Sequence, residues 1–279
     1  MPLRLVLIAT APPAALWVDA ALRDMGHDVV AIVSLRVAPD RFGPHKPARI
    51  LDAAAPDGDV LFISSPARLA SLLAAYAPDV AVCSSFPARI PDPALAVPRY
   101  GVVNVHPGLL PRYPGPNPMG WALRNGDREM GLTVHRMTPE FDAGPILAQG
   151  AIPVTDDDDA ASLTAKLGGL SGLLRAALER VAAGAAGDPQ PDEGRGYAGT
   201  FEPEYVDVDW SWSARDIHRQ TQAWSLAPPV QGRRGPCTEL DGRRVRLLRT
   251  RLDGSAGGTP VSCGEGTLWV LKTEPVTAD

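Results

Sequence analysis

Cysteine and long apolar stretches are both scarce in this sequence. The 279 residues include three cysteines, Cys83, Cys237 and Cys263, and an odd number at wide spacing indicates neither a disulfide framework nor a zinc site. The apolar start, MPLRLVLIATAPPAALW, is broken at Pro12-Pro13, so it predicts a buried strand followed by a helix and not a signal peptide. No segment is apolar enough to span a bilayer, and we expect a cytoplasmic protein.

A glycine-rich dinucleotide fingerprint is also absent. The first apolar run is followed by ATAPPAAL, which lacks the glycines that let a backbone approach a pyrophosphate. NAD binding is therefore disfavoured. The formal net charge is -5, so the molecule as a whole does not attract nucleic acid or an anionic membrane.

The pattern that is present predicts a doubly wound α/β domain with a Rossmann-like parallel sheet. Short branched-apolar runs alternate with segments of helical spacing, which is typical of βαβ units buried on both faces. We expect strands over 3–9, 28–34, 59–63, 79–84, 102–105, 131–137 and 145–153, and helices over 67–76, 118–125 and 160–183.

The composition changes after residue 183. Residues 184–200, GAAGDPQPDEGRGYAGT, are rich in glycine, proline and charge, which predicts a linker. We therefore expect a catalytic domain over 1–183 and a small β-rich, barrel-like domain over 201–279. In the latter, Ser213 to Asp216 matches a helix capping box and Asp241-Gly242 marks a hairpin.

The chemistry is concentrated in GVVNVHPGLLPRYPG (101–115) and FDAGPI (141–146). Asn104 and His106 are two apart at a strand end, so their side chains share a face at the edge where open α/β sheets bind ligands. Transfer of an acyl-type group between nitrogens needs oxyanion donors and a proton acceptor. Asn104, His106 and Asp142 could supply both without a metal or covalent intermediate, with the carboxylate orienting the histidine and raising its pKa. By spacing alone, an N-x-H pair is more often accidental, and Asp142 could simply form a turn.

The motif adds a family resemblance. NVHPGLLPRYPG resembles the N-x-H-P-S-L-L-P-x-x-x-G signature of the 10-formyltetrahydrofolate-dependent formyltransferases, which act on methionyl-tRNA, glycinamide ribonucleotide or amino sugars. The residues that follow, up to ILAQ, are similar to the family's G-V-T-x-H-x-M and D-x-G-x-I/L elements. Tyr197-Ala198 and Val208-Asp209-Trp210 look like the junction to the small C-terminal domain of the methionyl-tRNA enzymes. The resemblance covers nearly the whole chain.

The resemblance implies that Asn104, His106 and Asp142 are catalytic and that 10-formyltetrahydrofolate is the donor. It also implies that two loops hold the pterin, one after the fourth strand and one before the aspartate. The residues implied in folate binding are Ser85, Phe86, Pro87, Arg89, Ile90, Thr138 and Glu140, although Phe86 and Ile90 could equally be core residues.

Three departures border the acceptor side of the motif. Gly108 replaces the usual serine or alanine, Pro114 stands where arginine is common, and Ala143 replaces the usual threonine. They leave the acceptor open. They also leave the transferred group open between formyl and formimidoyl, the latter carried by 5-formimidoyl-tetrahydrofolate.

Two further features have plain structural interpretations. His135 lies on an expected buried strand, where a hydrogen-bonded structural histidine is the favoured interpretation. The run Asp156–Asp159 precedes an expected helix, whose N-terminus favours negative charge. A magnesium site is the alternative there, but nothing nearby completes it.

The acceptor is predicted from charge. Residues 201–279 contain ten Lys/Arg and eleven Asp/Glu, without the basic excess that a tRNA-binding domain needs. We therefore expect a small-molecule or peptidyl primary amine as acceptor and no nucleic-acid or membrane partner. Methionyl-tRNA as acceptor, hydrolysis of the folate donor on the same site, and a tRNA- or nucleotide-binding protein with a vestigial transferase site remain alternatives. The oligomeric state is open.

Overall fold

The computed structural model describes residues 1–36 and 58–276. The chain forms two compact units that alternate along the sequence. Unit 1 contains Met1–Gly115, Gly131–Ala151 and Leu167–Tyr197, and unit 2 contains Pro116–Met130, Ile152–Lys166 and Ala198–Asp279. The domain boundaries expected at 183 and 200 stay a prediction.

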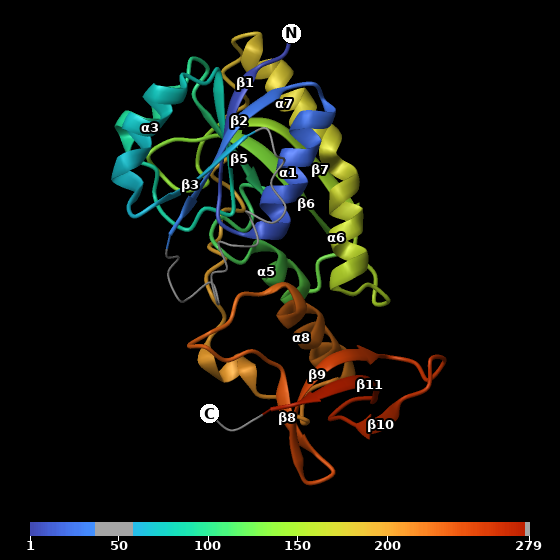
Figure 1. Ribbon diagram of the computed structural model, residues 1–279. Coiled ribbons are helices and arrows are strands. Elements are labelled where there is room, and N and C mark those ends of the chain that lie inside the picture. The colour runs from blue at the N-terminus through green and yellow to red at the C-terminus, as the bar shows by residue number, and fades with distance from the viewer. Residues whose placement is uncertain (37–57, 277–279) are drawn as a thin grey trace. The chain divides into compact units, whose positions relative to one another are not determined.

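A seven-stranded sheet in the order β3-β2-β1-β4-β5-β6-β7 confirms the Rossmann-like fold (Figure 1). The first five strands are parallel, and β6 runs antiparallel to β5. The carboxyl ends of the parallel strands therefore share one edge of the sheet. The strands are β1 (Arg4–Ala9), β2 (Asp28–Leu35), β3 (Asp59–Ile63), β4 (Val80–Ser84), β5 (Val102–His106), β6 (Glu129–Arg136) and β7 (Ile146–Pro153).

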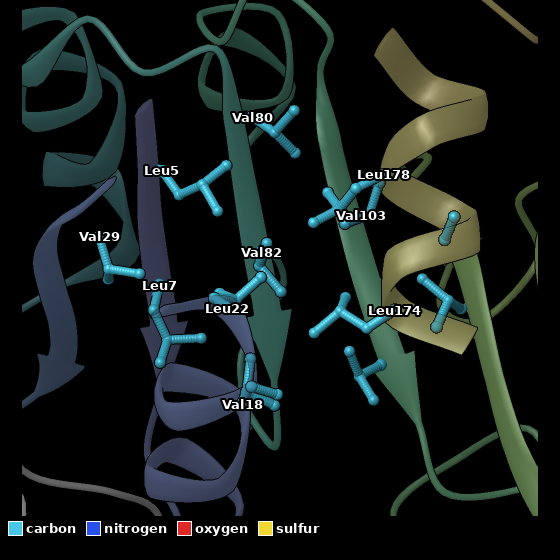
Figure 2. Packing of buried hydrophobic residues seen from close by; sticks show 14 of the residues in the cluster. Leu5, Leu7, Val18, Leu22, Val29, Val80, Val82, Val103, Leu174 and Leu178 are labelled. Atoms are coloured by element: carbon cyan, nitrogen blue, oxygen red, sulfur yellow. The ribbon is translucent and has the colours of Figure 1, made fainter. Parts of the chain in front are cut away.

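Helices cover both faces of this sheet. On one face, α1 (Pro12–Asp24) and α7 (Gly172–Ala182) pack against β1, β4 and β5 through a large apolar cluster (Figure 2). On the other face, α3 (Leu69–Tyr76), preceded by a 3-10 turn over Pro66–Arg68, and α4 (Asp92–Leu95) pack against a second cluster. This two-sided burial explains the continuous branched-apolar runs in the sequence.

The prediction of one continuous helix over 160–183 is wrong. The segment divides into α6 (Ala160–Gly168), a 3-10 turn over Gly169–Ser171 and α7. The break falls at Gly168-Gly169, where two consecutive glycines weaken helical propensity.

Unit 2 contains a four-stranded antiparallel sheet in the order β10-β11-β9-β8. Its strands are β8 (Cys237–Leu240), β9 (Arg243–Arg251), β10 (Thr259–Ser262) and β11 (Thr267–Pro275). The helix α8 (Ala214–Leu226) packs on β9 and β11, and also contacts α5 (Pro118–Arg124). The β-rich C-terminal part is therefore confirmed.

Local signals in unit 2 are confirmed as well. The Ser213 side chain caps α8 by accepting a hydrogen bond from the Asp216 backbone N–H. Asp241 and Gly242 connect β8 to β9 with φ angles of 51° and 71°, as a tight hairpin of primed turn type requires.

The four consecutive aspartates have separate partners. Asp159 and Ser162 exchange side-chain-to-backbone hydrogen bonds at the start of α6, at 2.9 and 3.0 Å. Asp158 is buried and accepts from Lys166 at 2.7 Å. Asp156 pairs with Arg215, and Asp157 with Arg251. A helix cap and ion pairs thus account for the run. Within residues 1–36 and 58–276, no group of His, Cys, Asp or Glu side chains is arranged to hold a metal ion.

Membrane-spanning helices are not found in the described ranges, where every helix is too short or too polar to cross a bilayer.

Candidate active site

The carboxyl end of β5 presents Asn104 and His106. Val103 and Val105 alternate with them and pack into the cluster under α1 and α7. Successive side chains of a strand point to opposite faces, so Asn104 and His106 share the other face. Because β5 is hydrogen-bonded to β4 on one side and β6 on the other, the position of both side chains is fixed by the sheet.

Asp142 reaches the same place from the loop between β6 and β7. Its carboxylate Oδ1 lies 3.4 Å from Asn104 Nδ2 and 3.6 Å from His106 Nδ1, and its Oδ2 accepts from the Gly115 backbone N–H at 2.8 Å. Its φ of 51° is a left-handed conformation that aspartate tolerates better than most residues. The structure therefore brings the three predicted residues together, and 12% of the Asp142 side chain is exposed.

His135 is a fourth member of this constellation. It lies directly opposite Asn104 in the β5–β6 register, and its Nε2 is 3.1 Å from Asn104 Nδ2. Its Nε2 is also 3.7 Å from Asp142 Oδ1. Buried and hydrogen-bonded, it fits the structural interpretation, but the sequence analysis did not place it against the reactive side chains. Only pairing of the two strands could have indicated this.

Gln190 supports the Asp142 loop and was not predicted. Its side-chain Nε2 donates to the backbone carbonyls of Asp142 and Gly144, both at 2.8 Å. It lies in the segment expected to be a linker, part of which pairs with β7 through the Ile146–Asp188 bridge. A polar residue in a glycine- and proline-rich stretch carries no sequence signal for this contact.

Thr133 ties the proline-rich loop after β5 to β6. Its hydroxyl donates to the Gly108 carbonyl at 2.6 Å and accepts from the Leu110 N–H at 3.2 Å. Gln149 adds hydrogen bonds to Leu110 and Thr133. The loop that carries Tyr113 and Gly115 into the site is therefore anchored at its beginning.

The site stabilises a carboxylate beside a neutral imidazole. Burial alone would raise the pKa of Asp142, but His135, His106 and the Gly115 N–H outweigh it and hold this pKa below its ordinary value. For His106, burial is the largest influence and lowers its pKa, although Asp142 acts in the opposite direction. The expected net rise of the His106 pKa is therefore wrong, because the imidazole is only 4% exposed.

His106 is engaged through one of its ring nitrogens. Its Nε2 is 3.0 Å from the Tyr113 carbonyl, which can only accept, so Nε2 carries the proton and Nδ1 faces Asp142. Asn104 Nδ2 likewise has acceptors for both of its hydrogens, His135 and Asp142. A substrate oxygen that accepts from the Asn104 amide must therefore displace one of these two contacts.

The residues expected to bind folate lie on two separate loops. Ser85 follows β4 with a φ of 52°, and Phe86 packs against the second apolar cluster. Ile90 is 2% exposed within that cluster, so its side chain is a core residue. Arg89 pairs with Asp92 on the surface. Pro87 lies between them in the same loop, partly exposed.

The second loop precedes Asp142. There the Thr138 hydroxyl donates to the carbonyl of Glu140 at 3.2 Å, and Glu140 is exposed. Folate contacts for these residues stay a prediction.

Cys83, at the end of β4, is a buried thiol near the site. Burial, with the Asp142 charge adding to it, raises the pKa of Cys83 to about 12. It is therefore protonated near neutral pH and does not act as a nucleophile.

A cavity of about 610 Å³ lies at the carboxyl ends of β2 and β3. It is lined by Arg36, Ser64, Arg68 and Ser71, with Phe62 among the apolar residues. The strands β1 and β4 separate it from β5, so these residues do not belong to the Asn104 constellation.

Comparison with known proteins identifies the family. A family model described as formyl transferase matches residues 15–172. The chain belongs to the formyl transferase family. It is 33% identical to a methionyl-tRNA formyltransferase of Myxococcus xanthus, over 98% of this chain and 90% of that protein. It is 34% identical to one of Acidothermus cellulolyticus, over 88% of this chain and 76% of that protein.

The fold is shared with solved structures of other proteins. HypX from Aquifex aeolicus in complex with tetrahydrofolic acid has a TM-score of 0.71 and 19% identity over 99% of this chain. This formyltransferase chain spans 45% of the length of HypX. Glycinamide ribonucleotide transformylase 1 from Symbiobacterium toebii matches with a TM-score of 0.53 and 26% identity, over 66% of this chain and 89% of that chain.

Proposed function

We propose that this formyltransferase moves a formyl group from 10-formyltetrahydrofolate to the primary amine of a small-molecule or peptidyl metabolite. The observation that carries the proposal is the meeting of Asn104, His106 and Asp142 at the carboxyl edge of the sheet. The family supplies the reaction type. The tetrahydrofolic acid in the HypX complex supports a folate donor.

In the proposed mechanism, Asp142 is the first group to accept the proton of the amine. The amine nitrogen attacks the formyl carbon, and the carbonyl oxygen becomes an oxyanion. This oxyanion accepts a hydrogen bond from the Asn104 amide, in place of Asp142 Oδ1. Asp142 takes the amine proton directly or through a water, and His106 Nδ1, 3.6 Å away, can share it. When the bond between the formyl carbon and N10 breaks, that proton passes to N10, so the site returns to its starting state.

The lowered pKa values fit this sequence of steps. A carboxyl with a depressed pKa is ionised near neutral pH and can accept a proton as soon as the attacking nitrogen becomes acidic. A neutral His106 avoids competing with the amine for Asp142 before attack. The proton that leaves the amine is then shared between Asp142 and His106, so its charge does not rest on one buried atom.

The charges of unit 2 support a small acceptor. Six of the ten basic residues in 201–279 are paired with carboxylates. In the part of the chain that the structure describes, Arg234, Arg243, Arg249 and Lys272 form no ion pair. Paired arginines have less to gain from phosphates, because a phosphate must first displace the carboxylate. This pairing favours a small acceptor.

The test is incubation of the purified protein with 10-formyltetrahydrofolate and a panel of amines, followed by mass spectrometry. Amino sugars, aminoacyl compounds and peptides gain one formyl mass if the proposal is right. A formimidoyl mass, with 5-formimidoyl-tetrahydrofolate as donor, would assign the variant chemistry. Donor cleavage that no amine stimulates would assign hydrolysis instead and overturn the proposal.

Methionyl-tRNA is the second candidate acceptor, because the relatives described above are methionyl-tRNA formyltransferases. One local feature agrees with it: Arg249 and Lys272 lie opposite each other across β9 and β11, where like charges destabilise a pair unless an anion covers them. Formylation of methionyl-tRNA, with affinity that falls steeply with salt and falls further in an R249A/K272A double variant, would assign this acceptor.

We also retain the division into a catalytic domain over 1–183, a linker over 184–200 and a small domain over 201–279 as a proposal. Limited proteolysis that cuts within 184–200 and releases the two flanking fragments would support it.

A further inference from the structure

We propose that His135 is a positioning residue for the transfer: its ring fixes which end of the Asn104 amide faces the reacting group. The inference rests on the proposed function for its catalytic consequence. The structural part rests only on the contacts among Asn104, His135, Arg136 and Asp142.

A backbone contact determines which ring nitrogen of His135 carries the hydrogen. Its Nδ1 is 2.9 Å from the backbone oxygen of Arg136. A carbonyl oxygen only accepts hydrogen bonds, so Nδ1 carries the hydrogen in this arrangement. A neutral imidazole has one such hydrogen, which leaves Nε2 as a bare acceptor.

The unprotonated Nε2 of His135 determines the orientation of the Asn104 side-chain amide. An asparagine side chain has a donor nitrogen and an acceptor oxygen of nearly equal size, and hydrogen-bond partners decide which way it is turned. A bare His135 Nε2 can be satisfied only by the nitrogen of Asn104, which lies 3.1 Å away. The oxygen of the amide in that place would put two lone pairs together in a buried site.

The contact with Asp142 requires the same orientation of the Asn104 amide. Asp142 Oδ1 is 3.4 Å from the same Asn104 nitrogen, and an ionised carboxylate only accepts. His135 and Asp142 therefore require the same end of the amide. His135 Nε2 is also 3.7 Å from Asp142 Oδ1, which is longer than a hydrogen bond, so the Asn104 nitrogen at 3.1 Å is its nearer partner.

The contact of Asn104 with His135 is more firmly fixed than its contact with Asp142. His135 is 2% exposed and sits directly across the strand pair from Asn104, so its bond holds one amide hydrogen throughout. Asp142 lies on a loop and accepts at the longer distance. The second amide hydrogen can therefore pass from Asp142 to the oxyanion without any rotation of the side chain.

Without an acceptor at His135, only the longer contact with Asp142 favours this orientation, and once the oxyanion replaces that contact the amide oxygen could turn toward it. The first test therefore compares His135→Gln with His135→Leu. A glutamine oxygen can accept where Nε2 accepts, whereas leucine fills space without accepting. We expect His135→Leu to lose about 10² in kcat with little change in the donor KM, and His135→Gln to recover most of kcat.

The second test needs no turnover. Nitrogen NMR of protein labelled with ¹⁵N-histidine, assigned by the signals that vanish in His135→Gln, reports the tautomer directly. We expect a protonated Nδ1 and a bare Nε2 on His135 near neutral pH. A protonated Nε2, wild-type kcat in His135→Leu, or equal losses in both variants would each overturn the inference. Absence of formyl transfer in the wild type, with the expected tautomer, would instead count against the proposed function.

Discussion

Gln190 holds the backbone of Asp142 in place from outside the loop that contains it. One side-chain nitrogen donates to the carbonyls of Asp142 and Gly144, both at 2.8 Å. A left-handed residue with a φ of 51° needs such support, because its backbone conformation is unfavourable for most side chains. The orientation of the Asp142 carboxylate thus depends on a residue 48 positions later in the chain.

Replacing Gln190 with alanine removes both hydrogen bonds. We expect a stability loss of about 1–3 kcal/mol, since two partly buried carbonyls lose their donor, and a fall in kcat that exceeds any change in donor affinity. Urea denaturation and steady-state kinetics measure the two effects. Glu193→Ala, at an exposed position in the same segment, is the control and should change neither. Wild-type kcat in Gln190→Ala would show that the loop is held without it.

Replacing Asp142 with asparagine keeps its shape and removes its charge. We expect binding of 5-formyltetrahydrofolate to persist and kcat to fall by about 10²–10⁴, the usual contribution of a positioned acid–base group. The Gly115 N–H can still find an oxygen acceptor, so the fold should be preserved. Calorimetry and turnover measured on one preparation would separate binding from chemistry. Near-wild-type turnover would remove Asp142 from the assigned role.

Stability should decline on the acid side because of two buried histidines. Burial, as the largest influence, holds the pKa values of His106 and His218 below the ordinary value of 6.5. Below pH 6.5 these histidines bind protons in the unfolded chain but not yet in the folded chain. Their contribution to the free energy of unfolding is therefore complete above this pH and is lost as the pH falls toward their pKa values in the folded state. Each histidine contributes at most about 1.4 kcal/mol per pH unit.

The His218→Gln variant tests this pH dependence. His218 Nε2 donates to the Asp156 carbonyl at 2.8 Å, and Nδ1 lies 2.8 Å from the Thr250 hydroxyl. Glutamine cannot titrate, so urea midpoints measured between about pH 5 and pH 8 should depend less steeply on pH than those of the wild type. Parallel curves for the two proteins would show that His218 does not contribute.

Gly144 is expected to tolerate no side chain. A Cβ at this position would lie 1.9 Å from the backbone oxygen of Arg136, in a strand end that cannot move without breaking its pairing. We expect Gly144→Ala to lose at least about 1–3 kcal/mol of stability, as overpacking does. Gly169→Ala is the matched control, because nothing lies within 4 Å of its Cβ. Equal thermal midpoints for the two variants would contradict this account.

Periodicity was sufficient to predict much of the fold. The runs that became β1, β2 and β3 are apolar because both faces of the sheet are covered, and Ser213 and Asp241-Gly242 are local signals that act within a few residues. The reversal of β6 could not be predicted, since strand direction depends on pairing and not on the composition of the strand. The break at Gly168-Gly169 was visible in the residues but outweighed by the apolar spacing around it.

The candidate site was predictable where residues are close in sequence or belong to a motif. Asn104 and His106 share a strand face, and Asp142 follows from the family resemblance. His135 and Gln190 join the site through a strand register and a long-range contact, which single-sequence reasoning does not contain. The sign of the His106 pKa shift was also beyond the sequence, because it depends on how deeply the ring is buried.

The most direct measurement is a single-turnover reaction with 10-formyltetrahydrofolate labelled with ¹³C in the formyl group, in the wild type and in Asp142→Asn. The account predicts that in the wild type the label moves to the amine nitrogen of the acceptor as one tetrahydrofolate is released, and that in Asp142→Asn it stays on the folate although the donor binds. Equal rates of label transfer in the two proteins, or no label on any amine with the wild type, would contradict it.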